Sequence, residues 1–369
     1  MWPESSETPK PLRTGFTTGS CATACCVAAA SYLLENLQPS IVSVTLPKGK
    51  TVEMEIINYQ QQTEGVRTAT IKDAGDDPDI THGAEIFVKL ALTVSPGIRF
   101  IAGNGVGTVT KPGLLLSVNE PAINPVPRQM MSDHLTAIAK QVNYSGGFKV
   151  TVGVVDGEQL ALKTMNPRLG ILGGLSILGT TGVVRPFSCA AWIASIRQGM
   201  DVAYANGVEH IVATTGNTSE TTIKEHYQLT DTALIEMGDF AGAVLKHLKK
   251  TPLKKLSLCG GFGKISKLAN GHLDLNSRVS AIDFEHLAKV AAEKGADKLL
   301  VASILGANTS IEALKLCQER NIALANGICE AAYRKARTIV PDSIEVEILA
   351  IDRKGKFVGG YPNILGESP

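Results

Sequence analysis

The segment between Arg168 and Arg185 combines several glycines with an otherwise apolar, uncharged sequence, LGILGGLSILGTTGVV. A glycine in such a segment costs conformational entropy unless an unusual dihedral or the close approach of another group requires it. The hydroxyls of Ser176, Thr180 and Thr181 add donors beside the glycine amides, and the flanking arginines add positive charge. The segment therefore predicts a site for an anionic or nucleotide-like ligand. Its glycines are Gly170, Gly173, Gly174, Gly179 and Gly182.

Three further glycine-rich phrases occur: GNGVGTVTKPG at 103–113, TTGNTSE at 214–220 and CGGFGKISK at 259–267. The last two follow predicted strands, and ligands bind at the carboxyl ends of strands in open α/β sheets. Each phrase alone could be a tight turn without a ligand. Together they favour a small-molecule site, which needs several convergent backbone surfaces.

The phrases do not match the common nucleotide fingerprints. A P-loop needs Ser or Thr after its Gly-Lys pair, but Ile265 follows Gly263 and Lys264, and Leu258 stands where the first glycine is required. A dinucleotide fingerprint needs a third glycine where this chain has Thr110 or Ser266. Phosphoryl transfer and ordinary NAD chemistry are therefore disfavoured.

Basic residues lie in or beside these phrases, and their placement predicts a ligand with several carboxylates, because arginine and lysine bind such groups. For any one of them, a solvated surface charge is the alternative. The formal net charge is only +1, so the chain offers no long-range attraction to nucleic acid or an anionic membrane. The residues are Arg13, Lys111, Arg128, Arg168, Arg185, Lys264 and Lys267.

Length and composition indicate a two-domain globular protein. A chain of 369 residues exceeds the size at which a single core stops growing. No apolar stretch has the length of a membrane span or the core of a signal peptide, so we expect a soluble, cytoplasmic protein. Cys21, Cys25 and Cys26 could hold a metal, but their small-residue helical pattern and the lack of a second ligand pair favour buried packing.

The elements predicted for residues 1–165 form a mixed α+β domain with an antiparallel or mixed sheet. Polar and apolar residues alternate over 40–46 and 51–58 on either side of a Pro-Lys-Gly turn, which predicts a hairpin. Helices are expected over 20–37 and 129–142, and further strands over 67–72, 85–93 and 149–155.

Residues 166–369 are predicted to form an α/β domain with Rossmann-like layers, because strands alternate with helices of ten or more residues and imply a mostly parallel sheet. The active cleft is expected between the two domains. Strands are predicted over 210–214, 256–259, 298–305 and 344–351, and helices over 188–198, 230–248, 284–294, 310–320 and 328–337.

Several long phrases, taken in order, closely resemble the cobalt-precorrin-5B (C1)-methyltransferase family, CbiD. They include RTGFTTGSCATA, NEPAINPVPR, TMNPRLGILGGLSILGTTGVVRPFS, TTGNTSE and GGFGKISKLANGHLDLNS. The resemblance extends from Arg13 to about Tyr361. Asn119 stands where the family phrase has glycine, and Asn276 where it has histidine.

The resemblance implies transfer of a methyl group from S-adenosylmethionine to C1 of cobalt-precorrin-5B, a step of anaerobic cobalamin biosynthesis that gives cobalt-precorrin-6A. The sulfonium donor is already activated, so alignment for in-line displacement is the main task and no protein-bound metal is needed. Cobalt is carried by the substrate, and the resemblance assigns no catalytic residue. A homo-oligomer is possible; no nucleic acid or membrane partner is expected.

On this hypothesis the donor contacts two glycine-rich segments, and the carboxylate arms of the macrocycle meet basic residues. The expected donor-binding residues are Gly173, Gly174, Gly179, Thr180, Thr181, Gly182, Thr215, Gly216 and Asn217. The expected substrate-binding residues are Arg13, Lys111, Arg128, Arg185 and Lys264. Two alternatives stay open: a non-catalytic tetrapyrrole-binding protein, and a nucleotide-dependent kinase or ligase.

Overall fold

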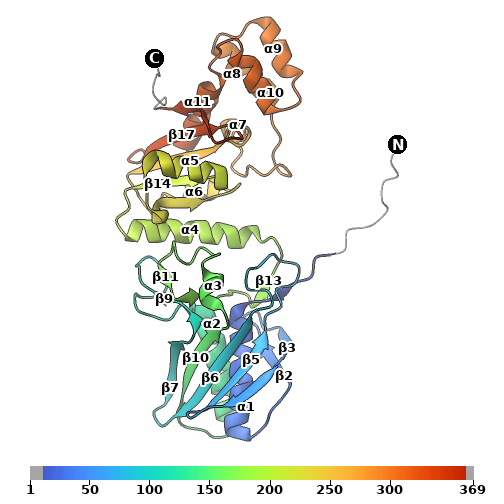
Figure 1. Cartoon of the computed structure of the whole chain (residues 1–369), viewed down its shortest axis with the longest axis vertical. Coiled ribbons are helices and arrows are strands. Elements are labelled where there is room, and N and C mark those ends of the chain that lie inside the picture. Colours follow the sequence, from blue (N-terminus) through green and yellow to red (C-terminus); the bar gives the residue numbers. More distant parts are fainter. Residues whose placement is uncertain (1–10, 363–369) are drawn as a thin grey trace, which may run out of the picture. The chain divides into compact units, whose positions relative to one another are not determined.

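The computed structural model describes residues 11–362, which form two compact units that divide between Cys189 and Ala190 (Figure 1). The glycine-rich segment 170–182 therefore belongs to the first unit, whereas the sequence pattern placed it at the start of a second domain. TTGNTSE and CGGFGKISK belong to the second unit.

The first unit contains a five-stranded mixed sheet, as predicted. Its strand order is β4-β5-β6-β10-β7, with β10 and β7 parallel and the other neighbours antiparallel. The helices are α1 (Thr18–Glu35), α2 (Pro125–Gln141) and α3 (Gly157–Ala161). The strands of the sheet and of the predicted hairpin are β2 (Ile41–Thr45), β3 (Thr51–Glu55), β4 (Asn58–Gln61), β5 (Val66–Ile71), β6 (Glu85–Thr93), β7 (Gly97–Ala102) and β10 (Gly147–Val154). Short strands are β1 (Gly15–Phe16), β8 (Gly105–Val106), β9 (Thr108–Val109), β11 (Ile171–Leu172), β12 (Gly174–Leu175) and β13 (Val183–Val184).

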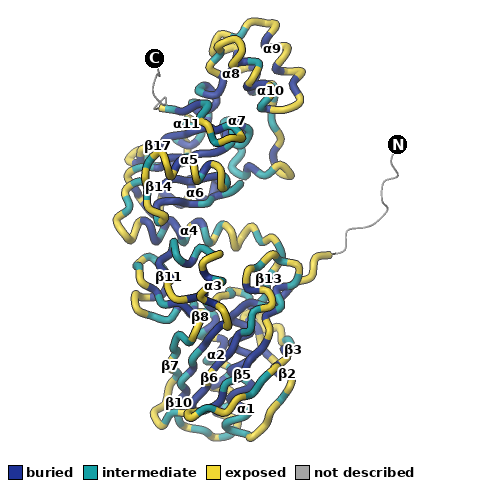
Figure 2. The backbone as a smooth tube through the Cα atoms, in the orientation of Figure 1, coloured by how far each residue is buried: buried dark blue, intermediate teal, exposed yellow. Residues whose placement is uncertain are grey.

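Helix α1 forms the centre of the first core because its small residues allow close packing against β5 and β6. Thr17 caps the helix, with its hydroxyl accepting a hydrogen bond from the Ser20 amide at 3.2 Å. Cys21, Cys25 and Cys26 are each 0% exposed, which confirms that this cluster is buried helix packing. Figure 2 shows the buried residues along β5 and β6 against this helix.

The second unit has a sheet of order β15-β14-β16-β17-β18 in which only the last pair is antiparallel, so the predicted mostly parallel sheet is confirmed. Its strands are β14 (His210–Thr214), β15 (Leu234–Glu236), β16 (Lys255–Gly261), β17 (Glu345–Ile351) and β18 (Phe357–Tyr361). Its helices are α4 (Cys189–Ala205), α5 (Asn217–Tyr227), η1 (Asp231–Ala233), α6 (Ala241–His247), α7 (Phe262–Ala269), α8 (Phe284–Glu293), α9 (Lys298–Leu305), α10 (Ser310–Gln318) and α11 (Leu324–Arg337).

Both faces of this sheet are covered, because alternate strand residues enter different clusters. Ile211 packs with residues of α4, α7 and α11 in the larger cluster, whereas Val212 packs with Ile223 of α5 on the opposite face. The period of two residues along a strand explains this division. The Rossmann-like layering predicted from the sequence is therefore confirmed.

Two predicted elements were wrong. Residues 298–305 form helix α9 and not a strand; a short apolar run is ambiguous between the two, and the Asp297 carboxylate decides by accepting a hydrogen bond from the Leu300 amide at 2.7 Å. The helix predicted over 230–248 is interrupted, because η1 and β15 precede α6. Helices α5 and α7, which begin within the phrases TTGNTSE and CGGFGKISK, were not predicted.

A polar network lies near the amino ends of three neighbouring strands in the second unit. Ser257 donates a hydrogen bond of 2.6 Å to Glu347, which also accepts one from Tyr227. The ring of His210 lies 2.8 Å from the Ser257 hydroxyl. Burial, followed by the charge of Lys255, lowers the pKa of His210, so folding favours the neutral form of this imidazole.

The network predicts a loss of stability in mild acid. Because the pKa of His210 is lower in the folded than in the unfolded chain, the unfolded chain binds the extra proton as the pH falls below about 6.5. The free energy of unfolding should therefore fall between pH 7 and pH 5, and His210→Gln should make that fall shallower. Urea unfolding at each pH measures this, and an unchanged slope in the variant would contradict it.

Candidate functional site

A cavity of about 850 Å³ lies within the second unit at the carboxyl ends of its parallel strands. The turns that follow β14, β16 and β17 line it, over 215–219, 261–264 and 351–353. TTGNTSE and CGGFGKISK thus come together as expected for phrases that follow neighbouring strands of one parallel sheet.

Two glycines leave the cavity wall open. A Cβ built on Gly216 or on Gly261 would meet no atom within 4 Å, and both residues line the cavity. Gly216 has φ 156° and ψ 178°, a conformation that side-chain-bearing residues rarely adopt. Gly260 differs, because a Cβ there would lie 2.6 Å from Cγ2 of Thr215. Gly216 and Gly261 therefore let a ligand approach the backbone.

Helix amino termini add partial positive charge to this wall. Helices α5 and α7 begin directly after Gly216 and Gly261, and neither terminus has a side-chain cap. The first residues of α10 also line the cavity, although Thr309 caps that helix. Uncapped amides and the helix dipoles favour an anionic ligand group such as a carboxylate.

Lys264 and Asp239 form an ion pair in the cavity wall. Lys264 Nζ lies 2.9 Å from Asp239 Oδ1 and donates a hydrogen bond of 3.2 Å to the carbonyl of Thr215. The structure therefore places Lys264 with Thr215, Gly216 and Asn217, three of the residues predicted for the donor. The other four basic residues predicted for the substrate belong to the first unit.

The glycine-rich segment 170–182 is approached mainly by groups of its own unit. A Cβ on Gly174 would lie 2.3 Å from the backbone of Gly105, and one on Gly179 would lie 2.3 Å from the Thr17 hydroxyl. Strands β12 and β11 pair with β8 and β9, so the segment packs against the phrase at 103–113. The prediction that other groups approach these glycines closely, or that their φ values are positive, is confirmed. Contact of the segment with a donor stays a prediction.

Other members of the segment have equally local surroundings. Gly182 is enclosed by Leu46 and Ser20, and its carbonyl accepts a hydrogen bond of 2.7 Å from the Ser20 hydroxyl. The Thr181 hydroxyl donates to the Val183 carbonyl at 3.1 Å. By contrast, Gly173 and Thr180 are exposed, and a Cβ on Gly173 would meet no atom within 4 Å. Among the residues of the segment predicted to contact the donor, these two are exposed.

Two of the predicted substrate-binding arginines already hold their own unit together. Arg128 Nη2 lies 2.9 Å from a Glu120 oxygen, and its Nε donates a hydrogen bond of 2.7 Å to the Ile123 carbonyl. Arg13 pairs with Asp73. Both arginines therefore have structural contacts, and their binding of substrate carboxylates stays a prediction.

The remaining two predicted basic residues have different settings. The aliphatic stem of Lys111 lies against Gly170, where a Cβ would be 2.5 Å from Lys111 Cγ. Arg185 is exposed directly after β13. Neither residue lines the cavity of the second unit. Their role with the substrate also stays a prediction.

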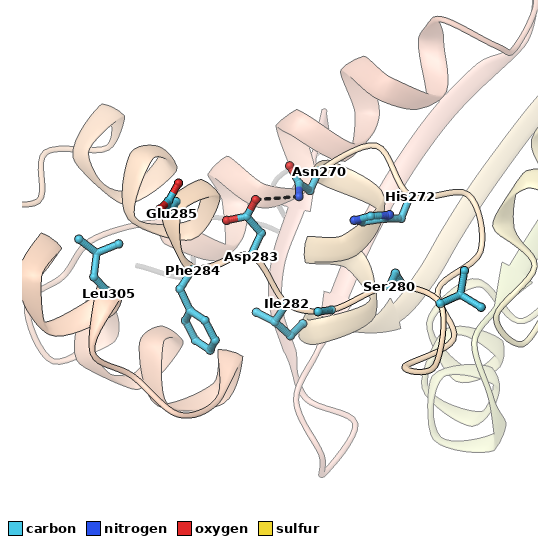
Figure 3. A pocket seen from close by; sticks show the side chains of 10 residues that line it. Asn270, His272, Ser280, Ile282, Asp283, Phe284, Glu285 and Leu305 are labelled. Carbon is cyan, nitrogen blue, oxygen red and sulfur yellow. Dashed lines mark hydrogen bonds between the residues drawn. The ribbon is translucent and has the colours of Figure 1, made fainter.

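A second cavity, of about 690 Å³, is lined by Asn270, His272, Asp283 and Glu285 among others (Figure 3). Asp283 caps α8 and accepts a hydrogen bond of 3.0 Å from the Asn270 amide. The hydrogen bond from the His286 amide is the main cause that lowers the pKa of Asp283. Since its described lining includes carboxylates and no lysine or arginine, this cavity suits an anionic ligand poorly.

The described residues 11–362 contain neither a metal-ligand cluster nor a membrane-spanning helix. In this part of the chain no three His, Cys, Asp or Glu side chains are grouped so that they could hold a metal ion. No helix within the same residues is long and apolar enough to cross a membrane.

The doubly covered, mostly parallel sheet, with a cavity lined by glycine-rich turns at its strand ends, defines an α/β protein of the open-sheet kind. The sequence model of CbiD matches residues 5–186, and that of the CbiD C-terminal domain matches residues 274–362. The chain belongs to the CbiD family.

Two curated relatives show how far the similarity extends. The cobalt-precorrin-5B C(1)-methyltransferase of Marinomonas sp. (strain MWYL1) is 62% identical over 97% of both chains. The protein of the same name from Burkholderia cenocepacia (strain HI2424) is 62% identical over 97% of this chain and 99% of its own. A solved structure, the cobalamin biosynthesis protein (cbiD) from Archaeoglobus fulgidus, is 28% identical over 68% of this chain and 78% of its own, with a TM-score of 0.39.

The departure at Asn119 has a conformational explanation. Asn119 has φ 72°, and its amide donates a hydrogen bond of 2.8 Å to the Val109 carbonyl. Asparagine is one of the few residues that tolerate the left-handed region in which glycine is otherwise favoured. The substitution therefore preserves the turn.

Proposed function

We propose that this chain transfers a methyl group from S-adenosylmethionine to C1 of cobalt-precorrin-5B, giving cobalt-precorrin-6A. The observation that carries the proposal is the 62% identity, over 97% of the chain, to relatives named for this methyl transfer. The cavity at the strand ends of the second unit supports it independently as a place for the donor.

The residues around this cavity fit the donor. Its volume lies within the range of about 300–1,000 Å³ that small-molecule sites occupy. Gly216 and Gly261 leave open space at the wall, and the uncapped amino termini of α5 and α7 suit the donor's carboxylate. We therefore propose that Thr215, Gly216 and Asn217 contact the donor, together with the turn that follows β16.

Bound in this cavity, S-adenosylmethionine would supply a methyl group that is already activated as a sulfonium. The chain's own task is then to orient donor and acceptor carbon for in-line displacement and to exclude water. Of the donor-binding residues predicted in the segment 170–182, Gly173 and Thr180 are the exposed ones and are proposed to contact the ligand. Arg13, Lys111, Arg128 and Arg185 remain the proposed partners of the substrate carboxylates, and cobalt enters with the substrate.

A reducing compartment fits this chain, and we propose the cytoplasm. All seven cysteines of the sequence are free, and all except Cys189 are buried or lie within the core helices and strands. Free thiols in this number are typical of proteins kept reduced.

Methyl transfer from isotope-labelled S-adenosylmethionine to purified cobalt-precorrin-5B tests the proposal. We expect one labelled methyl group per macrocycle, located at C1 by NMR. If the chain binds the macrocycle but neither binds S-adenosylhomocysteine nor transfers the label, it is a non-catalytic tetrapyrrole-binding protein. ATP binding that requires magnesium, without methyl transfer, would instead support a kinase or ligase.

A further inference from the structure

Asp239 is a carboxylate in the cavity wall whose hydrogen bonding is incomplete. It follows β15, the strand next to β14, and its side chain is 24% exposed. Its Oδ1 is enclosed and lies near Lys264 Nζ without a hydrogen bond of good geometry. Its Oδ2 accepts a hydrogen bond of 3.2 Å from the Asn276 amide. An ionised carboxylate can accept about four hydrogen bonds, so Asp239 retains capacity for a ligand donor.

The other carboxylate in this wall, Asp352, stabilises a turn of its own through one oxygen. Its Oδ1 accepts hydrogen bonds from the amides of Lys354 at 2.8 Å and Lys356 at 2.9 Å, which close the turn between β17 and β18. Asp239 is the candidate for a ligand contact because Lys264 connects it to the turn at Thr215. Oδ1 of Asp239 is buried, so a ligand would approach the carboxylate at Oδ2.

The partners of Asp239 decide which ligand group suits it. Lys264 supplies a positive charge 2.9 Å away, so the carboxylate needs no cation from the ligand. A phosphate or carboxylate of the ligand would be repelled, whereas a neutral hydroxyl can donate a hydrogen bond. In Rossmann folds that bind dinucleotides, an acid about 20 residues after the glycine-rich turn accepts a hydrogen bond from a ribose hydroxyl. Asp239 follows β15, and Gly216 follows β14.

Accepting the proposed function, we propose that Asp239 accepts a hydrogen bond from a ribose hydroxyl of the methyl donor and so selects an unmodified ribose. Lys264 is a positioning residue. Its ammonium contacts both Asp239 and the Thr215 carbonyl, and it thereby fixes the acid relative to the donor-binding turn. Lys264 thus serves the donor, and not the macrocycle carboxylates for which the sequence pattern had suggested it.

Isothermal titration of the full chain with S-adenosylhomocysteine and with its 2′-deoxy and 3′-deoxy analogues tests this proposal. The wild-type chain should bind at least one deoxy analogue about tenfold or more weakly than S-adenosylhomocysteine, as expected for loss of a hydrogen bond to a charged group. Asp239→Ala should bind all three ligands with similar affinity. Lys264→Met should reduce the ratio between the affinity for S-adenosylhomocysteine and the affinity for the discriminated deoxy analogue. Lys264→Arg should restore most of this ratio.

Asp342→Ala is the matched control, because this carboxylate is exposed and lies outside the cavity. It should retain the wild-type ratio. If Asp239→Ala destabilises the fold, as thermal unfolding would reveal, Asp239→Asn gives the same comparison with the shape preserved and should lower the ratio. The ribose assignment alone is overturned if the wild-type chain binds S-adenosylhomocysteine and both deoxy analogues with similar affinity. It is also overturned if both Asp239 variants keep the wild-type ratio of these affinities. Absence of any S-adenosylhomocysteine binding to the wild-type chain overturns the proposed donor site as well.

Discussion

Replacing Gly261 by leucine should weaken donor binding by up to about 100-fold while the fold remains intact. Gly261 has φ −59° and ψ 141°, which any residue can adopt, and a Cβ there would meet no atom within 4 Å. The added side chain would occupy space at the wall that the donor needs. Overfilling a packed site costs about 1–3 kcal/mol, so the affinity for S-adenosylhomocysteine should fall by up to about 100-fold. Isothermal titration measures this loss, and methyl transfer should fall with it.

Ala302→Leu provides the control for this substitution. Ala302 is exposed on α9 in the same unit and does not line the cavity, so the added leucine should leave binding unchanged. Both variants should unfold at a temperature close to that of the wild-type chain. Wild-type affinity in a folded Gly261→Leu variant would show that the donor binds elsewhere.

The second large effect concerns stability. Gly174→Ala should lower the free energy of unfolding of the first unit by about 3 kcal/mol or more, because the new Cβ would lie 2.3 Å from backbone atoms of Gly105 and 2.7 Å from the Val106 amide nitrogen. Backbone atoms cannot rotate aside as a flexible side chain can. Strands β8 and β12 would have to separate.

Gly173→Ala is the matched control one residue away. A Cβ on Gly173 would meet no atom, so only its positive φ of 81° opposes the substitution, at about 1–2 kcal/mol. Scanning calorimetry measures the loss of stability in both variants. It can separate the unfolding transitions of the two units, which need not unfold together. Equal effects would contradict the role assigned to close backbone packing.

The architecture could be predicted from the sequence where one local signal dominated. Alternation of polar and apolar residues predicted the hairpin strands β2 and β3, and the alternation of strands with helices predicted the parallel sheet. Strands β6 and β14 were predicted with their observed ends. The apolar residues of α9 have no such periodicity, so the choice between strand and helix depended on the cap at Asp297.

The site could be predicted only in part, because a sequence shows that glycine is required without showing what approaches it. Gly174 and Gly216 look alike in their glycine-rich phrases, yet the first faces its own chain and the second faces open space. Similarly, Arg128 and Lys264 are both basic residues beside such phrases, but their acidic partners, Glu120 and Asp239, are fixed by tertiary structure.

The packing of Gly174 on Gly105 also determines which second mutations could repair a defect there. Gly105 is in turn packed against Gly157, so three backbones meet with no side chain between them. Shortening a neighbour cannot relieve a clash with a main chain, and a genetic screen starting from Gly174→Ala should recover true revertants in preference to local suppressors. At Gly179 the obstacle is the side chain of Thr17. Because Cβ of Thr17 is among the clashing atoms, only glycine at position 17 would remove this obstacle, and these two glycines of one segment should therefore differ in whether a second substitution can relieve the clash.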